Sequence, residues 1–360
     1  MQRRVFLSGA FAAAGVMGLG EGRMAQAAGQ ATGLYVPPEE ARHARTFMQW
    51  PVTRQVYADP YFREAVQDTI AHIANEISAF EPVVMLAAKE HHNRLRSRLS
   101  SGVTLWDIPT DDLWCRDSGP LFAITDQGSL AVSHIQFNGW GAKQRASNDE
   151  KIAQSVAQRL GIPVIPSQVV GEPGGVDHDG HGLMIAHESS WIDPKRNPGL
   201  SRRQIEQRLL AAYGADRMIW SPGVQREDIT DYHIDGLARF TGPGRILLTL
   251  PDDPDPMDPF HQAALETHDR LVDAGLAVEV IPDPVEVRVN SVDFVASYAN
   301  YYVCNGAVIM AQFGDPEADP IAKAALRRHY PGREIVALNV DVLGELGGGI
   351  HCATQQMPAL

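Results

Sequence analysis

Apolar residues recur at helical spacing in five segments of the chain, and a short apolar run follows each segment. The first segment begins at Asp59-Pro60, an N-cap followed by a proline that suits the first helical turn. Its apolar face consists of Phe62, Val66, Ile70, Ile73, Ile77 and Phe80. The apolar run 83–86 after it is typical of a buried strand. The same order recurs at 147–165, 201–220, 258–280 and 318–338.

Local signals mark the ends of these helices. Ser147 with Glu150, and Ser201 with Gln204, have the spacing of a capping box and predict the start of the second and third helices. Gly161 follows the second helical pattern and predicts its end. We therefore expect five helix-to-strand units. Further strand patterns lie at 131–137, 182–187, 244–250 and 301–311.

The alternation of helices and strands predicts the α/β class. No linker rich in Ser, Pro or Gly divides residues 34–360, so we expect a single domain there. The spacing of the units is irregular, and a doubly wound sheet and a barrel both fit it. The pattern alone therefore leaves the architecture open.

The first 27 residues have the composition of an export signal. Arg3-Arg4 precedes Val5-Phe6-Leu7, an uncharged stretch rich in Ala and Gly follows, and 25–27 (AQA) has the small-x-small form of a cleavage site. The uncharged stretch is short for a membrane span. We expect a twin-arginine signal at 1–27 and a periplasmic or secreted protein.

Composition and charge narrow the classes of function. The chain has 360 residues, of which 44% are hydrophobic, and its formal net charge is −13. The acid excess argues against binding to a nucleic-acid backbone and would tolerate a cationic small molecule. Its three cysteines, Cys115, Cys304 and Cys352, are too few for a disulfide scaffold, and no CxxC is present.

Two clusters combine carboxylates with other functional groups. DDLWCRDSGP at 111–120 places three carboxylates, an arginine and Trp114 together; alone, it is also compatible with a solvated loop in which Arg116 neutralises its neighbours. In the second cluster His233 stands between Asp231 and Asp235. If this segment is extended, the three side chains share one face. A histidine between two carboxylates is a candidate acid or base.

Two glycine-rich clusters remain ambiguous. GEPGGVDHDGHG at 171–182 suggests metal ligands, yet its polar residues also fit a hairpin tip, which is the stronger interpretation because no other cluster supplies a closing ligand. GELGGGIHCATQQMP at 344–358 leads through three glycines to His351-Cys352. Cys352 is either a nucleophile or an inert buried thiol.

Together the clusters resemble the agmatine deiminase and bacterial peptidyl-arginine deiminase family of the guanidino-group-modifying superfamily. The resemblance covers the chain from about residue 34 to its end. The matching motifs are TFMQWP at 46–51, DDLWCRDSGP at 111–120, FNGWGAK at 137–143, EPGG at 172–175, NPGLSRRQIEQRL from 197, ITDYHIDGLARF at 229–240, SYANYYVCNG at 297–306 and GGGIHCATQQMP at 347–358. It implies a five-bladed αβ-propeller with approximate fivefold symmetry.

The resemblance also implies roles for particular residues. Asp117 and Asp235 correspond to carboxylates that bind the substrate guanidinium, and Cys352 and His233 to the nucleophile and the general acid-base. Glu172 corresponds to the carboxylate that holds this histidine or the guanidinium. Further substrate contacts are expected from Trp114, Trp140 and Asp231, although each tryptophan is equally compatible with packing in the core. Cys115 and Cys304 are expected to pack in the core. No metal or organic cofactor is required.

The implied reaction is hydrolytic deimination of a guanidine, agmatine first and peptidyl-arginine as the alternative. Amidino transfer and a non-catalytic guanidine-binding protein are weaker alternatives, and a homo-oligomer remains open. Tyr232 stands where the family commonly has Gly, Pro173 and Gly175 replace more usual residues, and GGGIHC lacks an Asn found in agmatine enzymes. These departures lie where substrate tails are recognised. We expect the Tyr232 ring to lie near the site.

Overall fold

The computed structural model describes residues 33–291 and 294–360. The predicted export signal at 1–27 lies outside the described residues. Within the described ranges, no helix is both long enough and apolar enough to cross a membrane.

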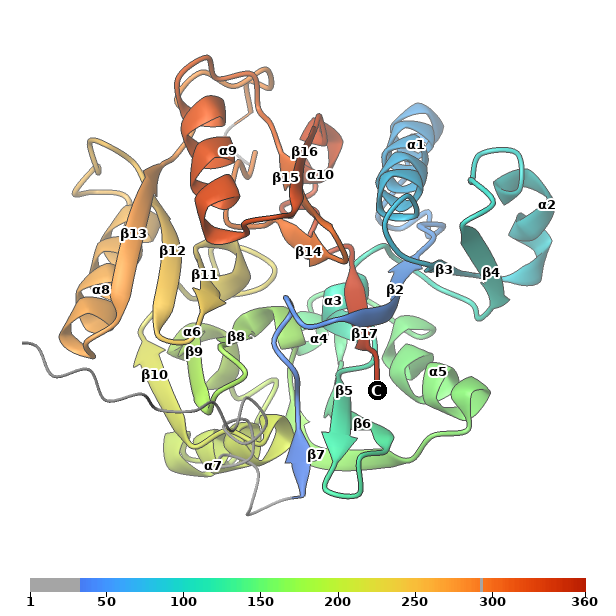
Figure 1. Ribbon diagram of the computed structural model, residues 1–360, viewed down its shortest axis with the longest axis horizontal. Helices are drawn as coiled ribbons and strands as arrows, with labels where there is room; N and C mark the ends of the chain where they lie inside the picture. The colour runs from blue at the N-terminus through green and yellow to red at the C-terminus, as the bar shows by residue number, and fades with distance from the viewer. Residues whose placement is uncertain (1–32, 292–293) are drawn as a thin grey trace, which may run out of the picture.

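The described residues form five mixed sheets, which Figure 1 shows arranged around the middle of the molecule. In spatial order, their strands are β17 (Gln355–Pro358), β2 (His43–Gln49), β3 (Val83–Ala87) and β4 (Val103–Asp107); β1 (Leu34–Tyr35), β5 (Phe122–Thr125), β6 (Leu130–Gln136) and β7 (Val164–Val170); β10 (Arg217–Ser221), β9 (Leu183–His187) and β8 (Val176–His178); β11 (Ala238–Gly242), β12 (Arg245–Leu250) and β13 (Ala277–Pro282); and β14 (Tyr302–Cys304), β15 (Ala307–Ala311) and β16 (Glu334–Leu338).

Five longer helices lie towards the outside of the sheets in Figure 1. They are α1 (Pro60–Ile77), α5 (Ile152–Leu160), α7 (Arg202–Tyr213), α8 (Pro259–Asp273) and α9 (Ala318–His329). The shorter helices are α2 (His92–Leu95), α3 (Cys115–Ser118), α4 (Gly139–Ala142), α6 (Glu188–Trp191) and α10 (Asp341–Gly344), and the 3-10 turns are η1 (Lys89–His91), η2 (Asp149–Lys151), η3 (Pro173–Gly175) and η4 (Ile234–Gly236).

One strand order recurs in all five sheets. An antiparallel pair is followed by a parallel pair, and one of the longer helices lies between the two parallel strands in the sequence. A parallel pair needs such a crossover because its strands run in the same direction. The five predicted helix-to-strand units and the α/β class are therefore confirmed.

Most predicted helix ends are also confirmed. Asp59 caps α1 by accepting a hydrogen bond from the Tyr61 amide, and Ser201 forms the predicted capping box with Gln204 at α7. The predicted box of Ser147 and Glu150 is wrong. A 3-10 turn at 149–151 precedes α5 instead, and no side chain caps that turn or the helix.

The last described strand lies next to the second. β17 pairs antiparallel with β2, with Gln355 opposite Phe47. The C-terminal segment thereby completes the sheet that the N-terminal part of the chain begins. Cys352 lies three residues before β17, so this pairing brings it towards the middle of the molecule (Figure 1).

Candidate active site

Asp117 lies on α3, in the loop that could have been a solvated acidic surface. That alternative is wrong, because Asp112, Arg116 and Asp117 are each at most 5% exposed. Asp117 Oδ2 accepts a hydrogen bond of 2.9 Å from Trp140 Nε1. Its Oδ1 is buried and has no hydrogen-bond partner among the described residues. His233 Nδ1 lies 3.6 Å from this oxygen, within ion-pair distance but beyond a hydrogen bond. One oxygen of this carboxylate is thus fixed, and the other can still accept a hydrogen bond from a ligand.

An unusual backbone conformation presents Trp140 to Asp117. The four residues of α4 have φ angles between +54° and +73°, and two of them, Trp140 and Ala142, are not glycines. Left-handed backbone is unfavourable for such residues and tends to persist where the surroundings enforce it. Asn138 stabilises the turn by accepting a hydrogen bond from the Gly141 amide. Trp140 thus holds Asp117, and the expected contact of its ring with substrate stays a prediction.

The EPGG segment brings Glu172 and a glycine to the same place. Glu172 precedes η3 and accepts a 3.1 Å hydrogen bond from His233 Nε2. A Cβ atom on Gly174 would lie 2.6 Å from Asp117 Oδ1, 3.0 Å from His233 Nδ1 and 3.2 Å from Asp235 Oδ2. The side chains of Asp117, His233 and Asp235 therefore converge on Gly174, where any side chain would collide with them.

His233 and Asp235 reach the site by a route that the alternation pattern did not predict. Asp231 and Tyr232 have left-handed backbone, and residues 234–236 form η4. The predicted extended segment with three side chains on one face is therefore wrong. The turn directs His233 and Asp235 towards Gly174, whereas Asp231 turns elsewhere.

Cys352 lies beside Asp235 and is held by Asn300. Its Sγ is 3.5 Å from Asp235 Oδ2 and 3.1 Å from Asn300 Nδ2. Asn300 Oδ1 also accepts a 3.2 Å hydrogen bond from the Cys352 amide. Trp114, which is partly buried, packs on Gly348 just before Cys352. The nucleophile candidate, two carboxylates and the histidine thus share one small region.

Burial and neighbouring charges set the protonation of this cluster. Burial raises the pKa of Asp117 to about 7, although the nearby His233 opposes the rise. Burial alone would lower the pKa of His233, but Asp117 and then Glu172 outweigh it and raise this pKa to about 9. Burial, followed by the charges of Asp235 and Asp117, raises the pKa of Cys352 well above its ordinary value. The free site therefore holds a protonated histidine and a neutral thiol.

Asp231 belongs to a neighbouring ionic cluster. The guanidinium of Arg196, buried completely, donates from Nε to both oxygens of Glu172 at 3.0 Å and from Nη1 to Asp231 Oδ2 at 2.6 Å. Lys143 Nζ lies 2.7 Å from the same Asp231 oxygen. Asp231 is thus neutralised by fixed cations of the protein, and Arg196 shares Glu172 Oε2 with His233.

The two aspartates in the second half of the glycine-rich segment 171–182 have structural partners. Asp177 accepts hydrogen bonds from Arg239 Nε and from the Phe240 amide. Asp179 closes the tip of the β8–β9 hairpin by accepting from the amides of His181 and Leu183, which confirms the hairpin interpretation. Within residues 33–291 and 294–360, no group of three or more His, Cys, Asp or Glu side chains could hold a metal.

Tyr232 and the other two cysteines lie outside the reacting cluster. The expectation of a Tyr232 ring near the site is wrong, because the ring stacks on His187 at 4.7 Å between centroids and meets the edge of Phe260. Cys115 and Cys304 are buried in apolar clusters, as expected, and burial raises the pKa of both thiols. Cys352 is partly exposed.

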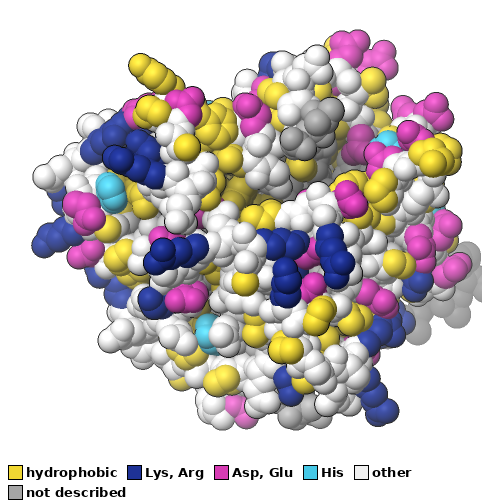
Figure 2. Space-filling model, turned by 180° about the vertical axis from the view of Figure 1, so that it is seen from behind, with side chains coloured by type: hydrophobic (Ala, Val, Ile, Leu, Met, Phe, Trp, Pro, Cys, Tyr) yellow, Lys and Arg dark blue, Asp and Glu magenta, His cyan; other side chains and the backbone are white. Residues whose placement is uncertain are grey.

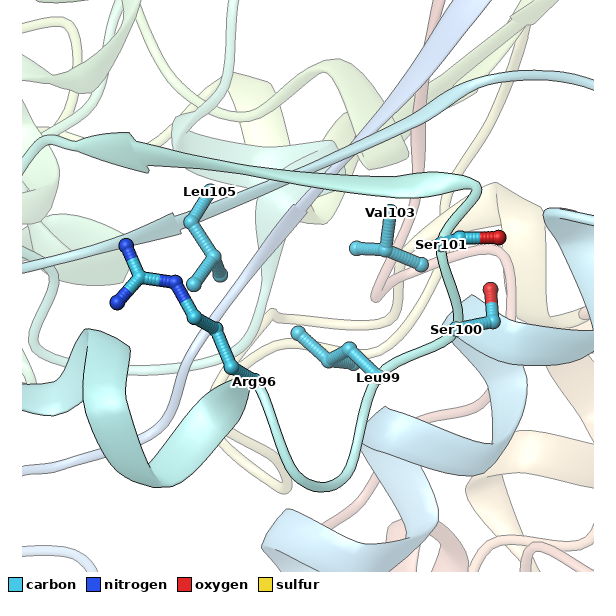
Figure 3. Close-up of a pocket in the computed structure, with 6 residues that line it drawn as sticks. All are labelled: Arg96, Leu99, Ser100, Ser101, Val103 and Leu105. Carbon is cyan, nitrogen blue, oxygen red and sulfur yellow. The ribbon is translucent and has the colours of Figure 1, made fainter.

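The surface offers a poorer candidate site than the buried cluster. Figure 2 shows Lys and Arg side chains gathered near the middle of one face, although the chain as a whole is acidic. A cavity of about 390 Å³ lies between the end of α2 and β4 (Figure 3). It is lined by Arg96, Leu99, Ser100, Ser101, Val103 and Leu105. It includes none of the converging residues, so we assign no chemistry to it.

Comparison with known proteins identifies the family. The sequence model of the Porphyromonas-type peptidyl-arginine deiminase family matches residues 35–358. The chain belongs to this family. A relative from Streptomyces coelicolor with the provisional name agmatine deiminase is 34% identical over 336 residues, covering 90% of this chain and 98% of its own.

Solved structures of the deiminases have the same fold. The structure described as agmatine deiminase of Enterococcus faecalis catalysing its reaction has a TM-score of 0.82 and 27% identity, covering 91% of this chain and 96% of its own. A provisionally named arginine deiminase from Porphyromonas gingivalis has a TM-score of 0.79 and 26% identity, covering 90% and 98%. The α/β class with mixed sheets is thus shared within the deiminase family.

Some residues around the site escaped the sequence analysis. Arg196 and Asn300 lie within or next to family motifs, but a lone Arg or Asn has no spacing that marks a role. Glu39, which binds Arg116, Arg239 and His351, comes from a loop with no motif. Only the hydrogen bonds of the folded chain identify them.

Proposed function

We propose that the protein is a guanidine deiminase that hydrolyses agmatine to N-carbamoylputrescine and ammonia, a reaction on the carbon–nitrogen bond of a linear amidine. The observation that carries the proposal is Oδ1 of Asp117, which is buried next to His233, Asp235 and Cys352 and has no hydrogen-bond donor among the described residues. A buried acceptor without a donor is costly unless a ligand supplies one. The family and the agmatine deiminases among its relatives support the assignment.

Substrate binding follows from the geometry of the two carboxylates. A guanidinium is planar and has donors on its edges, so carboxylates on different sides can hold it in one orientation. In our proposal, Asp117 Oδ1 and Asp235 bind its nitrogens and place its central carbon over Cys352 Sγ. Because the reactants are pre-oriented, the attack becomes effectively intramolecular.

Activation of the thiol depends on the substrate. The pKa of Cys352 is raised by burial and by Asp235 and Asp117, so the free site disfavours the thiolate. The incoming cation neutralises these carboxylates and stabilises the thiolate. The Cys352 thiol therefore loses its proton to solvent. The thiolate then forms a bond to the guanidinium carbon. His233, which is already protonated, donates its proton to the departing amino group, and ammonia leaves.

Hydrolysis of the amidino-thioether regenerates the enzyme. His233, now neutral, takes a proton from water as the water oxygen bonds to the amidino carbon. The carbon–sulfur bond then breaks, the thiolate leaves, and the ureido product is released after losing a proton. Glu172 keeps His233 oriented through both steps.

Peptidyl-arginine is the second candidate substrate, because the matching family model describes peptidyl-arginine deiminases. The test is release of ammonia and of ureido product from agmatine and from an arginyl peptide, with wild type and Cys352→Ala. We expect turnover of agmatine by wild type alone. Activity that survives in Cys352→Ala contradicts the mechanism, and turnover of the peptide alone reassigns the substrate.

The same assay separates the remaining alternatives. An amidinotransferase gives product only when an acceptor amine is added. A guanidine-binding protein without catalysis shows binding of agmatine by calorimetry and no ammonia. Either result would contradict hydrolytic deimination and assign the corresponding alternative function.

We also propose that residues 34–360 form a single-domain five-bladed αβ-propeller with approximate fivefold symmetry. The five repeated sheets support this architecture.

We further propose export by a twin-arginine signal at 1–27. The Arg3-Arg4 motif supports export. For export, a reporter fused after residue 33 should reach the periplasm, and changing both arginines to lysine should keep it in the cytoplasm. A reporter that stays inside in both cases contradicts this part.

A further inference from the structure

His351 lies between two buried carboxylates, next to the nucleophile in the chain. Its Nδ1 is 2.7 Å from Asp235 Oδ2, and its Nε2 is 2.9 Å from Glu39 Oε2. The residue is 3% exposed. The proposed reaction assigns this histidine no step, and the family motif marks it only as the neighbour of Cys352.

Both hydrogen-bond partners of the ring are acids. Burial would raise the pKa of both carboxyl groups. For Asp235, the contacts with His351 outweigh burial and lower the pKa; for Glu39, Arg239, His351 and Arg116 lower it well below its usual value. Ionised carboxylates only accept hydrogen bonds, so an acceptor stands in front of each ring nitrogen of His351. The site is therefore built for a ring that donates from both nitrogens.

We propose that His351 is a positioning residue whose charged ring holds Asp235 for guanidinium binding and offsets the negative charge beside Cys352 Sγ. The first half of this proposal rests on the proposed function, since it concerns the substrate. The second half concerns the free enzyme and can be tested without substrate.

The surrounding structure explains why Asp235 needs such a partner. It lies on η4, a three-residue turn, so its side chain has no long helix or strand to restrict it. His351 is itself fixed, because its amide donates to the Asn300 carbonyl at 3.1 Å. Asn300 also holds the amide and thiol of Cys352. Asn300 thus fixes His351, and with it Asp235, relative to the nucleophile Cys352.

Glu39 fixes the far side of the ring. It also accepts from Arg116 Nη2 at 3.0 Å and pairs with Arg239 Nη2 at 3.1 Å, and Arg239 pairs in turn with Asp177. The charged groups in contact with the His351 ring are therefore Asp235 and Glu39. Asp177 also interacts with the ring electrostatically, Arg116 Nε donates to the His351 carbonyl, and both arginines pair with Glu39. Loss of the imidazolium would remove the cation bonded to Asp235 and leave His233 and Arg239, which act on Asp235 without a hydrogen bond to it.

Two substitutions separate the two bonds of the ring. In His351→Asn the side-chain amide nitrogen takes the place of Nδ1 and can still donate to Asp235. In His351→Gln it takes the place of Nε2 and can donate only to Glu39. We expect kcat/KM for agmatine to fall at least about tenfold more in the Gln variant, mainly through KM, because one charge-assisted bond to the binding carboxylate is lost. Equal losses in the two variants contradict positioning of Asp235.

The free enzyme provides the second test. The pH dependence of Cys352 alkylation by iodoacetamide reports the ionisation of the thiol, with Cys352→Ala as the blank for Cys115 and Cys304. Both variants lack the positive charge, so the midpoint should rise by about 1 pH unit or more. His92→Asn, a buried histidine that bonds only the Ala87 carbonyl, is the matched control and should leave the midpoint unchanged.

The outcomes are distinguishable from failure of the proposed function. If wild type turns over neither agmatine nor the arginyl peptide but the alkylation midpoint rises in both variants, the proposed function is wrong and the charge role of His351 stands. An unchanged midpoint in folded variants, verified by circular dichroism, overturns that role. If one variant does not fold, the other still decides the midpoint.

Discussion

Asp117 uses its two carboxylate oxygens differently, whereas Glu172 and Asp235 each use one oxygen for two contacts. Each acid nevertheless has a fixed donor of the protein: Trp140 for Asp117, Arg196 for Glu172 and His351 for Asp235. Fixed partners of this kind hold the acids in orientation before substrate arrives, so little reorganisation is needed on binding.

The pH dependence of the reaction follows from two residues of the cluster. Asp117 must be ionised to bind a guanidinium, and its pKa of about 7 makes it neutral at lower pH. His233 must be protonated to donate, and its pKa of about 9 makes it neutral at higher pH. We expect a bell-shaped profile of kcat/KM against pH with limbs near these values, which belong to the coupled pair. A profile that is flat from pH 6 to 10 contradicts this protonation scheme.

Trp140→Phe tests the role of the indole N–H. The ring is retained, whereas Asp117 Oδ2 loses the hydrogen bond that favours its charged form. We expect kcat/KM to fall about tenfold or more and the acid limb of the profile to move to higher pH. Trp220→Phe is the control, because Trp220 is equally buried and its indole donates to Glu206, away from the site. Equal effects of the two substitutions would remove the specific role of Trp140.

At the scale of elements, short turns rather than long helices or strands carry the site. Asp117 lies on α3, Trp140 on α4 and Asp235 on η4, while Glu172 and Cys352 lie in loops. The longer helices and strands were predictable because each buries one face, and a buried face requires apolar residues at a regular spacing along the sequence. The turns were not predictable, because the left-handed backbone of residues such as Asp231 and Tyr232 depends on tertiary contacts. The family motifs located the site residues, and neither hydropathy nor spacing gave the directions of their side chains.

The two capping-box sequences provide a test at the same scale. Ser201 caps α7, whereas Ser147 caps neither η2 nor α5. We expect Ser201→Ala to lower the free energy of unfolding by about 1 kcal/mol. Ser147→Ala, the matched control, should change it by less than about 0.5 kcal/mol. Chemical denaturation measures both, and a larger loss at Ser147 contradicts the observed helix start.

At the scale of the whole molecule, the middle is ionic and the apolar cores lie around it. The large apolar clusters pack between helices and sheets. Near the site, Glu39 from the N-terminal loop binds Arg116 before β5, Arg239 on β11 and His351 before β17. Segments from opposite ends of the sequence thus meet through charges. No sequence pattern marks such a network, because its members share no periodicity.

Glu39→Gln tests how much this ionic network contributes to the stability of the fold. The substitution leaves Arg116, Arg239 and His351 buried without their shared anion. Since breaking a buried ionic cluster on one side is strongly destabilising, we expect a loss of about 3 kcal/mol or more in the free energy of unfolding. Glu40→Gln, at the neighbouring half-buried position, should cost less than about 0.5 kcal/mol. Equal costs would show that the network contributes little.

The pairing of β17 with β2 has a consequence for biosynthesis. The two strands are separated by about three hundred residues, and contacts between such distant segments form late and slowly during folding. A ribosome synthesises the segment with Cys352 and β17 after the strands β1 to β16. Chains synthesised only up to β16 therefore hold every strand of four sheets but no reactive centre, and the enzyme should become active in a single step when β17 is inserted.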